Sequence, residues 1–271
     1  MTSTTVITVI VIVLVSVLLH IVQAQQHQQP TATTNTLINN CCDLGFRQST
    51  FSEIVNKPKQ YKMKNMCGND HSTITNVYCD TVTAGGGWLV IQGRINGSVD
   101  FNKYWSEYEE GFGNLPVDDE DTTGEFWIGL RSLHCLTSQG QWELRIDYML
   151  SNKTKGYLSY HQFRVGPSSD DYRLSISGFS GNTTDPVIAI GGRNLNGMTF
   201  TTRDRDNDKR DGGENCAVYF PGGNAGGWWY NDCSYIVPNH QYNHRFSAYL
   251  NRQWHSLPFI EVKIRPLNCN L

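Results

Sequence analysis

The sequence predicts an α+β domain built mainly from antiparallel strands, with short helices and a loop-rich C-terminal part. Three observations indicate this class: several segments alternate apolar and polar residues, helical spacing is confined to two short stretches, and periodicity disappears after about residue 191. The chain has 271 residues, 39% of them hydrophobic, so it can bury a core. Its net charge is −3 and its Lys and Arg residues are scattered, which argues against nucleic-acid binding.

The chain opens with an apolar run that predicts a signal peptide. Residues 6–22 are almost wholly apolar but short for a membrane span, and Val22-Gln23-Ala24 supplies small or apolar residues where a signal peptidase reads. We therefore expect residues 1–24 to be a signal peptide and the mature protein to be secreted and extracellular. Because no Lys or Arg precedes the run, an uncleaved membrane anchor is the alternative. Residues 25–40 are mostly polar and predict a disordered leader.

Helical and strand patterns then follow along the ordered part. Helical spacing spans residues 102–110 and 125–134, and Gly111 is a plausible stop for the first helix. Alternation predicts strands over residues 142–148, 172–176 and 260–264, each with one buried face. From about residue 191 to 253, Gly, Asn, Asp and aromatic residues dominate. Loops on a rigid scaffold commonly carry binding residues, so we expect the binding site there.

The cysteines indicate an oxidising compartment. An even number of cysteines behind a signal peptide predicts disulfide bonds, and the absence of a Cys-x-x-Cys pair argues against a structural zinc site. Asn-x-Ser/Thr sequons predict glycosylation at Asn96, Asn152 and Asn182. The eight cysteines are Cys41, Cys42, Cys67, Cys79, Cys135, Cys216, Cys233 and Cys269.

A series of short motifs runs from Cys42 to Pro266, about five sixths of the chain. They include Val77-Tyr78-Cys79-Asp80, Gly85-Gly86-Gly87-Trp88, Gly97-Ser98-Val99-Asp100-Phe101, Gly124-Glu125-Phe126-Trp127, Asn215-Cys216-Ala217-Val218 and Val262-Lys263-Ile264-Arg265-Pro266. In this order the motifs resemble the fibrinogen C-terminal-like domain of ficolins, tachylectins, angiopoietins and the fibrinogen chains. The resemblance implies a domain over residues 41–271, with an N-terminal subdomain (41–80), a central sheet subdomain (81–190) and a calcium- and ligand-binding subdomain (191–267).

A calcium site is the sharpest local expectation. Asp206 and Asp208 stand two positions apart, so in an extended loop their carboxylates fall on one side, and carboxylate oxygens are ligands that Ca²⁺ takes. The resemblance implies that these aspartates bind Ca²⁺ together with backbone carbonyls downstream. The segment from Asp208 to the next cysteine is two residues longer than in the family. Counting forward gives the carbonyls of Arg210 and Gly212, and counting back gives Gly212 and Glu214.

The resemblance also implies disulfide pairs and a ligand pocket. It pairs Cys42, or its neighbour Cys41, with Cys79, and pairs Cys216 with Cys233. The pocket lies beside the second pair, where a cis peptide joins the residues matching Asp232 and Cys233. A non-proline cis bond costs roughly 3 kcal/mol, so the surrounding loop would have to enforce it. The ligand-binding residues expected here are Phe220, Tyr230, Asp232, Cys233 and Tyr249.

The chain departs from the family around this pocket. Ser234 replaces the family's histidine, the loop between the two cysteines is longer, and the aromatic-rich tail between Trp254 and Glu261 is shorter by about ten residues. The pocket is therefore expected to be remodelled.

Two functions compete at this point. The first is a lectin-like recognition protein of innate immunity that binds acetylated or other glycans on cell surfaces with calcium support, and that can form homo-oligomers. The alternative is an extracellular protein ligand or matrix component. Catalysis is not expected, because His-Glu-x-x-His, Gly-x-Ser-x-Gly and Walker motifs are absent.

Overall fold

The computed structural model describes residues 37–44, 60–64, 74–116, 124–188, 193–219, 224–242 and 247–269. The expected signal peptide lies outside these residues, as does most of the expected leader. The leader was expected to reach residue 40, but Leu37–Ile38 form a strand, β1, in which Ile38 is buried. The end of that segment is therefore ordered. Within the described ranges, every helix is too short or too polar to cross a bilayer.

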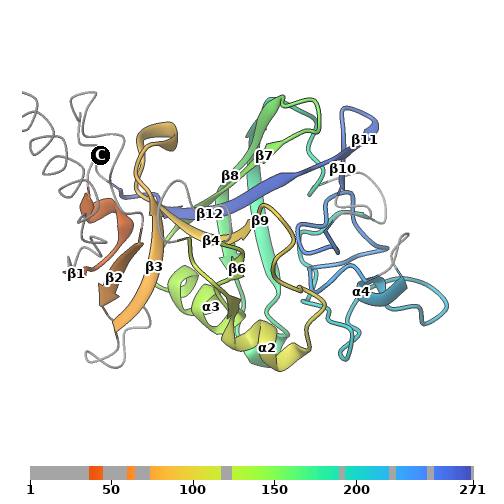
Figure 1. Ribbon diagram of the computed structural model, residues 1–271. Helices are drawn as coiled ribbons and strands as arrows, with labels where there is room; N and C mark the ends of the chain where they lie inside the picture. Colours follow the sequence, from red (N-terminus) through yellow and green to blue (C-terminus); the bar gives the residue numbers. More distant parts are fainter. Residues whose placement is uncertain are drawn as a thin grey trace, which may run out of the picture. The chain divides into compact units, whose positions relative to one another are not determined.

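A ten-stranded sheet forms most of the described fold (Figure 1). Eight strands run in the order β1-β2-β3-β4-β12-β7-β8-β9, and the short β5 and β6 join at β4. All neighbouring pairs are antiparallel except β1 with β2. The strands other than β1 are β2 (Gln60–Lys64), β3 (Ile74–Asp80), β4 (Trp88–Arg94), β5 (Phe112–Gly113), β6 (Phe126–Trp127), β7 (Trp142–Met149), β8 (Lys155–Val165), β9 (Leu174–Gly181) and β12 (Phe259–Pro266).

The predicted alternation explains the central strands. In β7, Trp142, Leu144, Ile146 and Tyr148 are buried, and the residues between them are partly exposed. The last strand, β12, lies between β4 and β7, so the C-terminal segment is part of the sheet centre. The strand expected from residue 172 begins only at Leu174.

Within the described ranges the helices are few and short. They are α2 (Trp105–Glu110), α3 (Leu130–Ser138), α4 (Cys216–Tyr219) and three 3-10 turns, η1 (Cys41–Leu44), η3 (Thr83–Gly85) and η4 (Ser168–Asp170). Helix α2 ends at Gly111, whose N–H donates to the Glu107 carbonyl at 2.8 Å, as the sequence predicts. The helix expected over 125–134 begins later, because Phe126–Trp127 pair with β4 instead. In Figure 1, α2 and α3 lie together on one side of the sheet.

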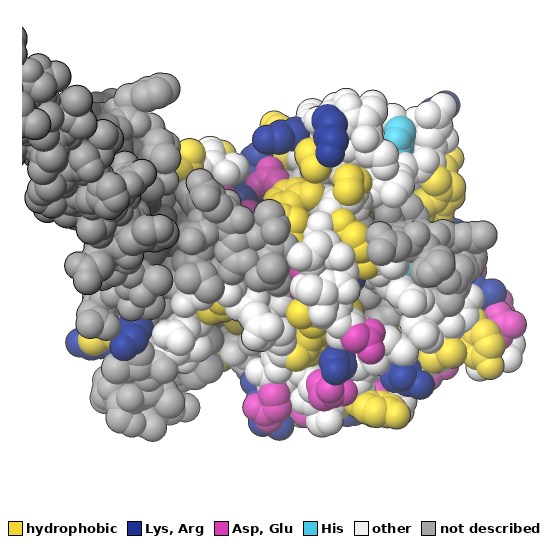
Figure 2. All heavy atoms as spheres, viewed as in Figure 1, with side chains coloured by type: hydrophobic (Ala, Val, Ile, Leu, Met, Phe, Trp, Pro, Cys, Tyr) yellow, Lys and Arg dark blue, Asp and Glu magenta, His cyan; other side chains and the backbone are white. Residues whose placement is uncertain are grey.

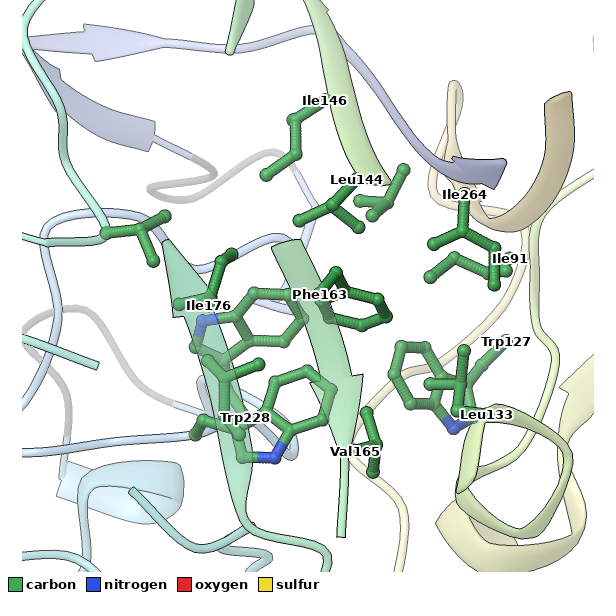
Figure 3. Packing of buried hydrophobic residues seen from close by; sticks show 14 of the residues in the cluster. Ile91, Trp127, Leu133, Leu144, Ile146, Phe163, Val165, Ile176, Trp228 and Ile264 are labelled. Carbon is green, nitrogen blue, oxygen red and sulfur yellow. The ribbon is translucent and has the colours of Figure 1, made fainter. Parts of the chain in front are cut away.

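Buried aromatic rings connect the sheet to the C-terminal loops. Trp127 and Trp229 both contact Phe200, with ring centroids 6.0 and 5.0 Å apart. The indole Nε1 of Trp229 donates to the carbonyl of Tyr172 at 2.7 Å, so its polar edge is satisfied inside the core. Figure 3 shows the adjoining part of this core, where Trp228 and Phe163 lie among aliphatic side chains from the sheet. These contacts fix the loops that follow residue 191 on the sheet.

A buried ion pair ties the same loops to β4. Arg94 and Glu125 are almost completely buried, with Nε and Oε2 3.6 Å apart. Arg94 Nη1 also donates to the carbonyls of Pro238 and His240, at 3.3 and 3.0 Å. Burial alone would raise the pKa of Glu125, but the Arg94 charge and hydrogen bonds from backbone N–H groups hold it below its usual range.

Disulfide bonds join both ends of the described fold to the sheet. Cys41 is bonded to Cys79 and Cys42 to Cys269. The predicted pairing of Cys42 with Cys79 was therefore wrong, and the alternative prediction, Cys41 with Cys79, is confirmed. The adjacent cysteines diverge at η1, and only Cys41 is directed into the core beside β3. Cys135 is also disulfide-bonded, and no described cysteine is free.

A separate hairpin completes the fold. Strands β10 (Ser247–Leu250) and β11 (Gln253–Ser256) form a two-stranded antiparallel sheet. In Figure 1 the hairpin and α4 both lie on the right, among the C-terminal loops.

Candidate functional site

The acidic loop that contains the expected calcium ligands begins next to helix α2. Asp204 Oδ1 accepts hydrogen bonds from the Trp105 N–H at 2.9 Å and from the Thr202 hydroxyl at 2.7 Å. Asn207 Nδ2 donates to the Phe200 carbonyl at 2.7 Å. The loop is therefore held at its start by the first turn of α2 and in its middle by the buried segment that carries Phe200.

The carboxylate of Asp208 joins this loop to the Cys216–Cys233 disulfide. Its Oδ2 accepts a hydrogen bond from the Cys216 N–H at 2.7 Å, and its Oδ1 accepts one from the Arg210 N–H at 2.9 Å. The Arg210 guanidinium lies 3.5 Å from the Cys233 sulfur. Asp208 therefore contacts the backbone of Cys216 directly, and it is connected to Cys233 through the side chain of Arg210.

The two aspartates differ in exposure and in their electrostatic surroundings. Asp206 is exposed and Asp208 is half-buried. Burial, and in addition the nearby charge of Asp206, raise the pKa of Asp208 to about 6. A divalent cation between the carboxylates would offset both effects, because it stabilises their ionised forms.

Backbone oxygens complete the possible ligand set. No described backbone N–H donates to the carbonyls of Arg210 or Gly212, so both oxygens are available. Gly212 has a φ of +88°, a conformation that glycine adopts without strain. In the part of the chain that the structure describes, no group of three or more His, Cys, Asp or Glu side chains could hold a metal. Ca²⁺ takes about six to eight oxygens, so an ion here would need carbonyl and water ligands besides Asp206 and Asp208. The donor set fits such an ion.

The structure separates the residues expected to bind the ligand. Asp232 is exposed and Tyr249 is half-buried, so both are accessible. Tyr230 is completely buried, and its hydroxyl donates to the carbonyls of Ala225 and Gly226 at 3.2 and 2.9 Å. Tyr230 therefore belongs to the core and cannot wall an open pocket as expected. Phe220 lies outside the described residues.

The peptide bond between Asp232 and Cys233 is trans, so the expected cis bond was wrong. The trans form is the lower in energy for a non-proline bond. The local backbone holds this segment through the Asn231 N–H, which donates to the Cys233 carbonyl at 2.9 Å. Ser234, in place of the family's histidine, is buried and its hydroxyl donates to the Ile236 carbonyl at 2.6 Å. It shapes the turn and is not exposed to a ligand.

An aromatic cluster that the sequence did not predict surrounds Tyr249. The Tyr235 ring stacks on the Tyr249 ring with centroids 4.7 Å apart, and the Trp254 ring lies 5.5 Å from that of Tyr249. The cluster depends on the β10–β11 hairpin, whose two turn residues, Asn251 and Arg252, have φ of +48° and +66°. Such a turn usually carries glycine, and its absence concealed the hairpin in the sequence.

The three sequon asparagines are exposed. Asn96, Asn152 and Asn182 all lie at the surface, which is compatible with the predicted glycosylation. The side-chain oxygens of Asn96 and Asn152 accept the backbone N–H of the Ser or Thr two residues later, at 2.9 and 3.0 Å. Asn182 instead accepts from the Tyr157 N–H at the sheet edge. Glycosylation itself stays a prediction.

Curated proteins with related sequences share this domain. Tenascin-R of Gallus gallus is 41% identical over 207 residues, which cover 73% of this chain and 14% of tenascin-R. Fibrinogen C domain-containing protein 1 of Mus musculus is 38% identical over 206 residues, covering 70% of this chain and 41% of that protein. The chain therefore spans less than half the length of these relatives.

Solved structures agree with the fold. The fibrinogen-like globe domain of human ANGPTL2 is 30% identical, with a TM-score of 0.66 over 84% of this chain and 99% of that chain. Lamprey fibrin D-dimer, complexed with the peptide Gly-His-Arg-Pro-amide, is 28% identical, with a TM-score of 0.72 over 99% of this chain and 88% of that chain. The predicted fold class is confirmed.

The family match covers most of the chain. Residues 49–267 match the C-terminal globular domain of the fibrinogen beta and gamma chains. Together with the disulfide bonds, the relatives support an extracellular ligand-binding domain. The chain belongs to the fibrinogen C-terminal domain family.

Proposed function

We propose that this protein is an extracellular lectin-like recognition protein, which binds glycans through its C-terminal loops with the support of Ca²⁺. The observation that carries the proposal is the hydrogen bond between Asp208 Oδ2 and the Cys216 N–H, at 2.7 Å. Through this contact, an ion that fixes Asp208 would also fix the disulfide loop that presents Asp232. The function is binding without catalysis, and a role in innate immunity follows if the glycans are foreign.

Calcium has a specific task in this proposal. Asp206, Asp208 and the carbonyls of Arg210 and Gly212 would hold the ion. Without it, the like charges repel each other, and the raised pKa of Asp208 reports that unfavourable environment. With it, the loop from residue 206 to 212 gains a fixed anchor next to the disulfide. The carbonyl of Glu214 is the alternative to that of Arg210 in this set.

A second candidate is recognition of a protein or peptide. The observation that favours it is the buried position of Tyr230, because a buried ring cannot line an open pocket of the size of an acetyl group. In addition, one solved relative, lamprey fibrin D-dimer, is complexed with a peptide. An extracellular ligand or matrix role would use the same loops.

Binding to a glycan array separates the two candidates. The full-length secreted protein should bind a subset of glycans in 1 mM Ca²⁺ (about the extracellular level), and a chelator should abolish that binding. Asp206→Asn should weaken binding, while Asp211→Asn, an exposed carboxylate in the same loop and outside the ligand set, should not. Absence of glycan binding by the wild type in calcium would reject the lectin function and leave the protein-ligand candidate.

A further inference from the structure

The acidic loop contains an aspartate that is followed by a glycine, Asp211-Gly212. The pair lies between Asp208 and Cys216, in the segment that is two residues longer than in the family. In such a pair, the backbone nitrogen of the second residue can attack the side-chain carboxyl carbon of the first and close a five-membered ring. Glycine in the second position favours this reaction, because it has no Cβ atom to obstruct the closure.

The pair is open to solvent. Asp211 and Gly212 are exposed, and so are Gly213 and Glu214 after them. A Cβ atom built on Gly212 or Gly213 would have no atom within 4 Å, so no described residue packs against this stretch of backbone. Figure 2 shows exposed acidic and basic side chains at the end of the domain where Figure 1 places α4, the helix that begins at Cys216 after this loop. The backbone at Asp211 therefore has room to rotate into the geometry that the ring requires.

Hydrogen bonds and an ion pair fix the ends of this stretch but not its middle. The Arg210 N–H donates to Asp208 Oδ1 at 2.9 Å, and the Arg210 guanidinium pairs with Glu214 at 2.6 Å. Between them, the described residues form no hydrogen bond or ion pair with the Asp211 carboxylate, and none with the Gly212 N–H. Both reacting groups are consequently without a competing partner in the described part of the chain.

Two asparagine–glycine pairs elsewhere in the chain carry the same reactive arrangement, and the fold holds both. In the first pair, the Gly97 N–H donates to Glu125 Oε1 at 2.8 Å. The Asn96 side-chain oxygen accepts the Ser98 N–H at 2.9 Å. A Cβ atom on Gly97 would also lie 2.8 Å from side-chain atoms of Tyr242, so the backbone is enclosed there. The nitrogen that would attack is thus engaged with a buried carboxylate.

The second pair, Asn196-Gly197, is held in the same way by the start of β9. The Gly197 N–H donates to the Leu174 carbonyl at 2.8 Å. The Asn196 side-chain oxygen accepts the Ile176 N–H at 2.9 Å. Ring closure would break both hydrogen bonds, and breaking each costs free energy. In an unfolded chain an asparagine–glycine pair reacts faster than an aspartate–glycine pair, so the fold reverses the order of reactivity.

We propose that Asp211 is a modification site, at which the folded protein converts aspartate into isoaspartate without an enzyme. The Gly212 nitrogen attacks the carboxyl carbon of Asp211. The N–H proton and the carboxyl hydroxyl leave as a water molecule, and a cyclic imide forms. Water then adds to the backbone carbonyl carbon of the imide, and the bond from that carbon to the Gly212 nitrogen breaks. The chain is then connected through the former side chain, and no oxidant, reductant or other co-reactant takes part.

The conversion would change the proposed calcium loop. Isoaspartate adds one methylene group to the backbone between Arg210 and Gly212, whose carbonyls belong to the proposed ligand set. This consequence rests on the proposed calcium-supported function, whereas the modification itself does not. Because the two carbonyls would no longer be spaced to reach the same ion, the converted protein should bind Ca²⁺ more weakly.

The test follows isoaspartate in the full-length secreted protein, incubated for days with a chelator at physiological pH and temperature. A protein isoaspartate methyltransferase labels the product, and peptide mapping locates it. We expect the label in the peptide that contains Asp211, while Asn196 stays unchanged. Asp211→Glu keeps the charge but should lose the signal, because its ring would have six members and closes more slowly. Asp211→Asn creates the more reactive pair and should be labelled faster than the wild type.

The same incubation in urea shows what the fold contributes. There Asn196 should convert faster than Asp211, the reverse of the order in the folded protein. The inference fails if Asp211 converts in urea but not in the folded protein, because the loop would then hold the pair. It also fails if Asn196 converts before Asp211 in the folded protein, because the hydrogen bonds would then give no protection.

Calcium titration of the converted and unconverted fractions, separated by chromatography, tests the consequence. We expect a tenfold or greater loss of affinity in the converted fraction. Equal affinity of the two fractions would show that the added methylene group does not disturb the ligand set. Absence of calcium binding by both fractions would reject the proposed calcium site and leave the modification site intact.

Discussion

The carboxylate of Asp208 experiences opposing influences from its surroundings. Backbone N–H groups of Arg210 and Cys216 favour its ionised form, whereas burial and the charge of Asp206 disfavour it more strongly. The net result is a pKa raised to about 6. A cation at the loop would reverse the balance, and this makes Asp208 the residue on which the proposed calcium site depends most.

At Glu125 the surroundings favour the ionised carboxylate. We therefore expect a substitution there to lower the stability of the fold strongly. Its Oε1 accepts hydrogen bonds from the N–H groups of Ile95, Asn96 and Gly97 at 2.7 to 2.9 Å, and Arg94 lies beside Oε2. Glu125→Gln retains an acceptor but leaves the buried Arg94 charge without its counter-ion. We expect a loss of about 3 to 5 kcal/mol in the free energy of unfolding, measured by urea denaturation.

Glu110→Gln is the matched control for this substitution. Glu110 pairs with Arg131 at the surface, with 64% and 59% of the two side chains exposed. Solvent screens such a pair, so no measurable change in stability is expected. Equal effects of the two substitutions would show that the Arg94–Glu125 pair does not stabilise the fold.

The interaction between Asp80 and Lys263 predicts that the free energy of unfolding depends on pH. Burial opposes ionisation of Asp80, but the Lys263 ammonium, 2.6 Å away, holds its pKa well below the usual value. Since the folded pKa is depressed, the stabilisation is present above the unfolded pKa of about 4 and is lost as the pH falls further. The wild type should therefore exceed Asp80→Asn by about 2 to 4 kcal/mol at pH 6, and by less at pH 3. A difference that is constant between pH 3 and 6, in denaturation curves of both proteins, would contradict this assignment.

At the scale of elements, the sequence predicted the strands with a clear period of two. β7 and β12 lie where alternation placed them, because each buries one face on the core. The segment 125–134 was assigned to one helix, but Phe126–Trp127 pair with β4 and the helix begins at Leu130. Local spacing could not reveal that pairing, since it depends on a strand more than 30 residues away in the chain (β4 begins at Trp88).

The candidate site was predictable only in its local features. The two aspartates of the acidic loop stand two positions apart in the sequence itself. The burial of Tyr230 and the aromatic cluster around Tyr249 were not predictable, because both depend on contacts between distant segments, such as Tyr235 with Tyr249. The β10–β11 turn also lacks the glycine that usually identifies such a hairpin.

The loop that carries Trp228 and Trp229 requires glycine at residue 226. Gly226 has a φ of +69°, and a Cβ atom there would lie 2.5 Å from the Asn239 carbonyl oxygen and 2.9 Å from that of Phe101. Gly226→Ala should therefore destabilise the protein by about 2 to 4 kcal/mol in thermal or urea unfolding. Gly140→Ala is the control, because no atom lies within 4 Å of its Cβ position. Equal stability of the two variants would show that the loop does not approach Phe101 and Asn239 as closely as described.

At the scale of the described domain, covalent and polar links connect the ends to the centre. The Cys42–Cys269 disulfide closes a sequence separation of 227 residues, and Cys41–Cys79 ties the same turn to β3. Arg94 and the Trp229 indole connect the sheet to the C-terminal loops. The acidic loop and the aromatic cluster around Tyr249 are thus attached to the sheet, as expected for a binding domain.

Calorimetric titration of calcium into the folded protein tests the central claim most directly. The wild type and Asp211→Asn should bind one ion with a Kd on the order of 10⁻⁴ to 10⁻³ M, and Asp208→Asn should show no binding heat. At 1 mM calcium, this affinity corresponds to about 0.4 to 1.4 kcal/mol of added stability, a shift of a few degrees in Tm. Absence of binding heat in the wild type, or equal binding by Asp208→Asn, would contradict the calcium-supported account.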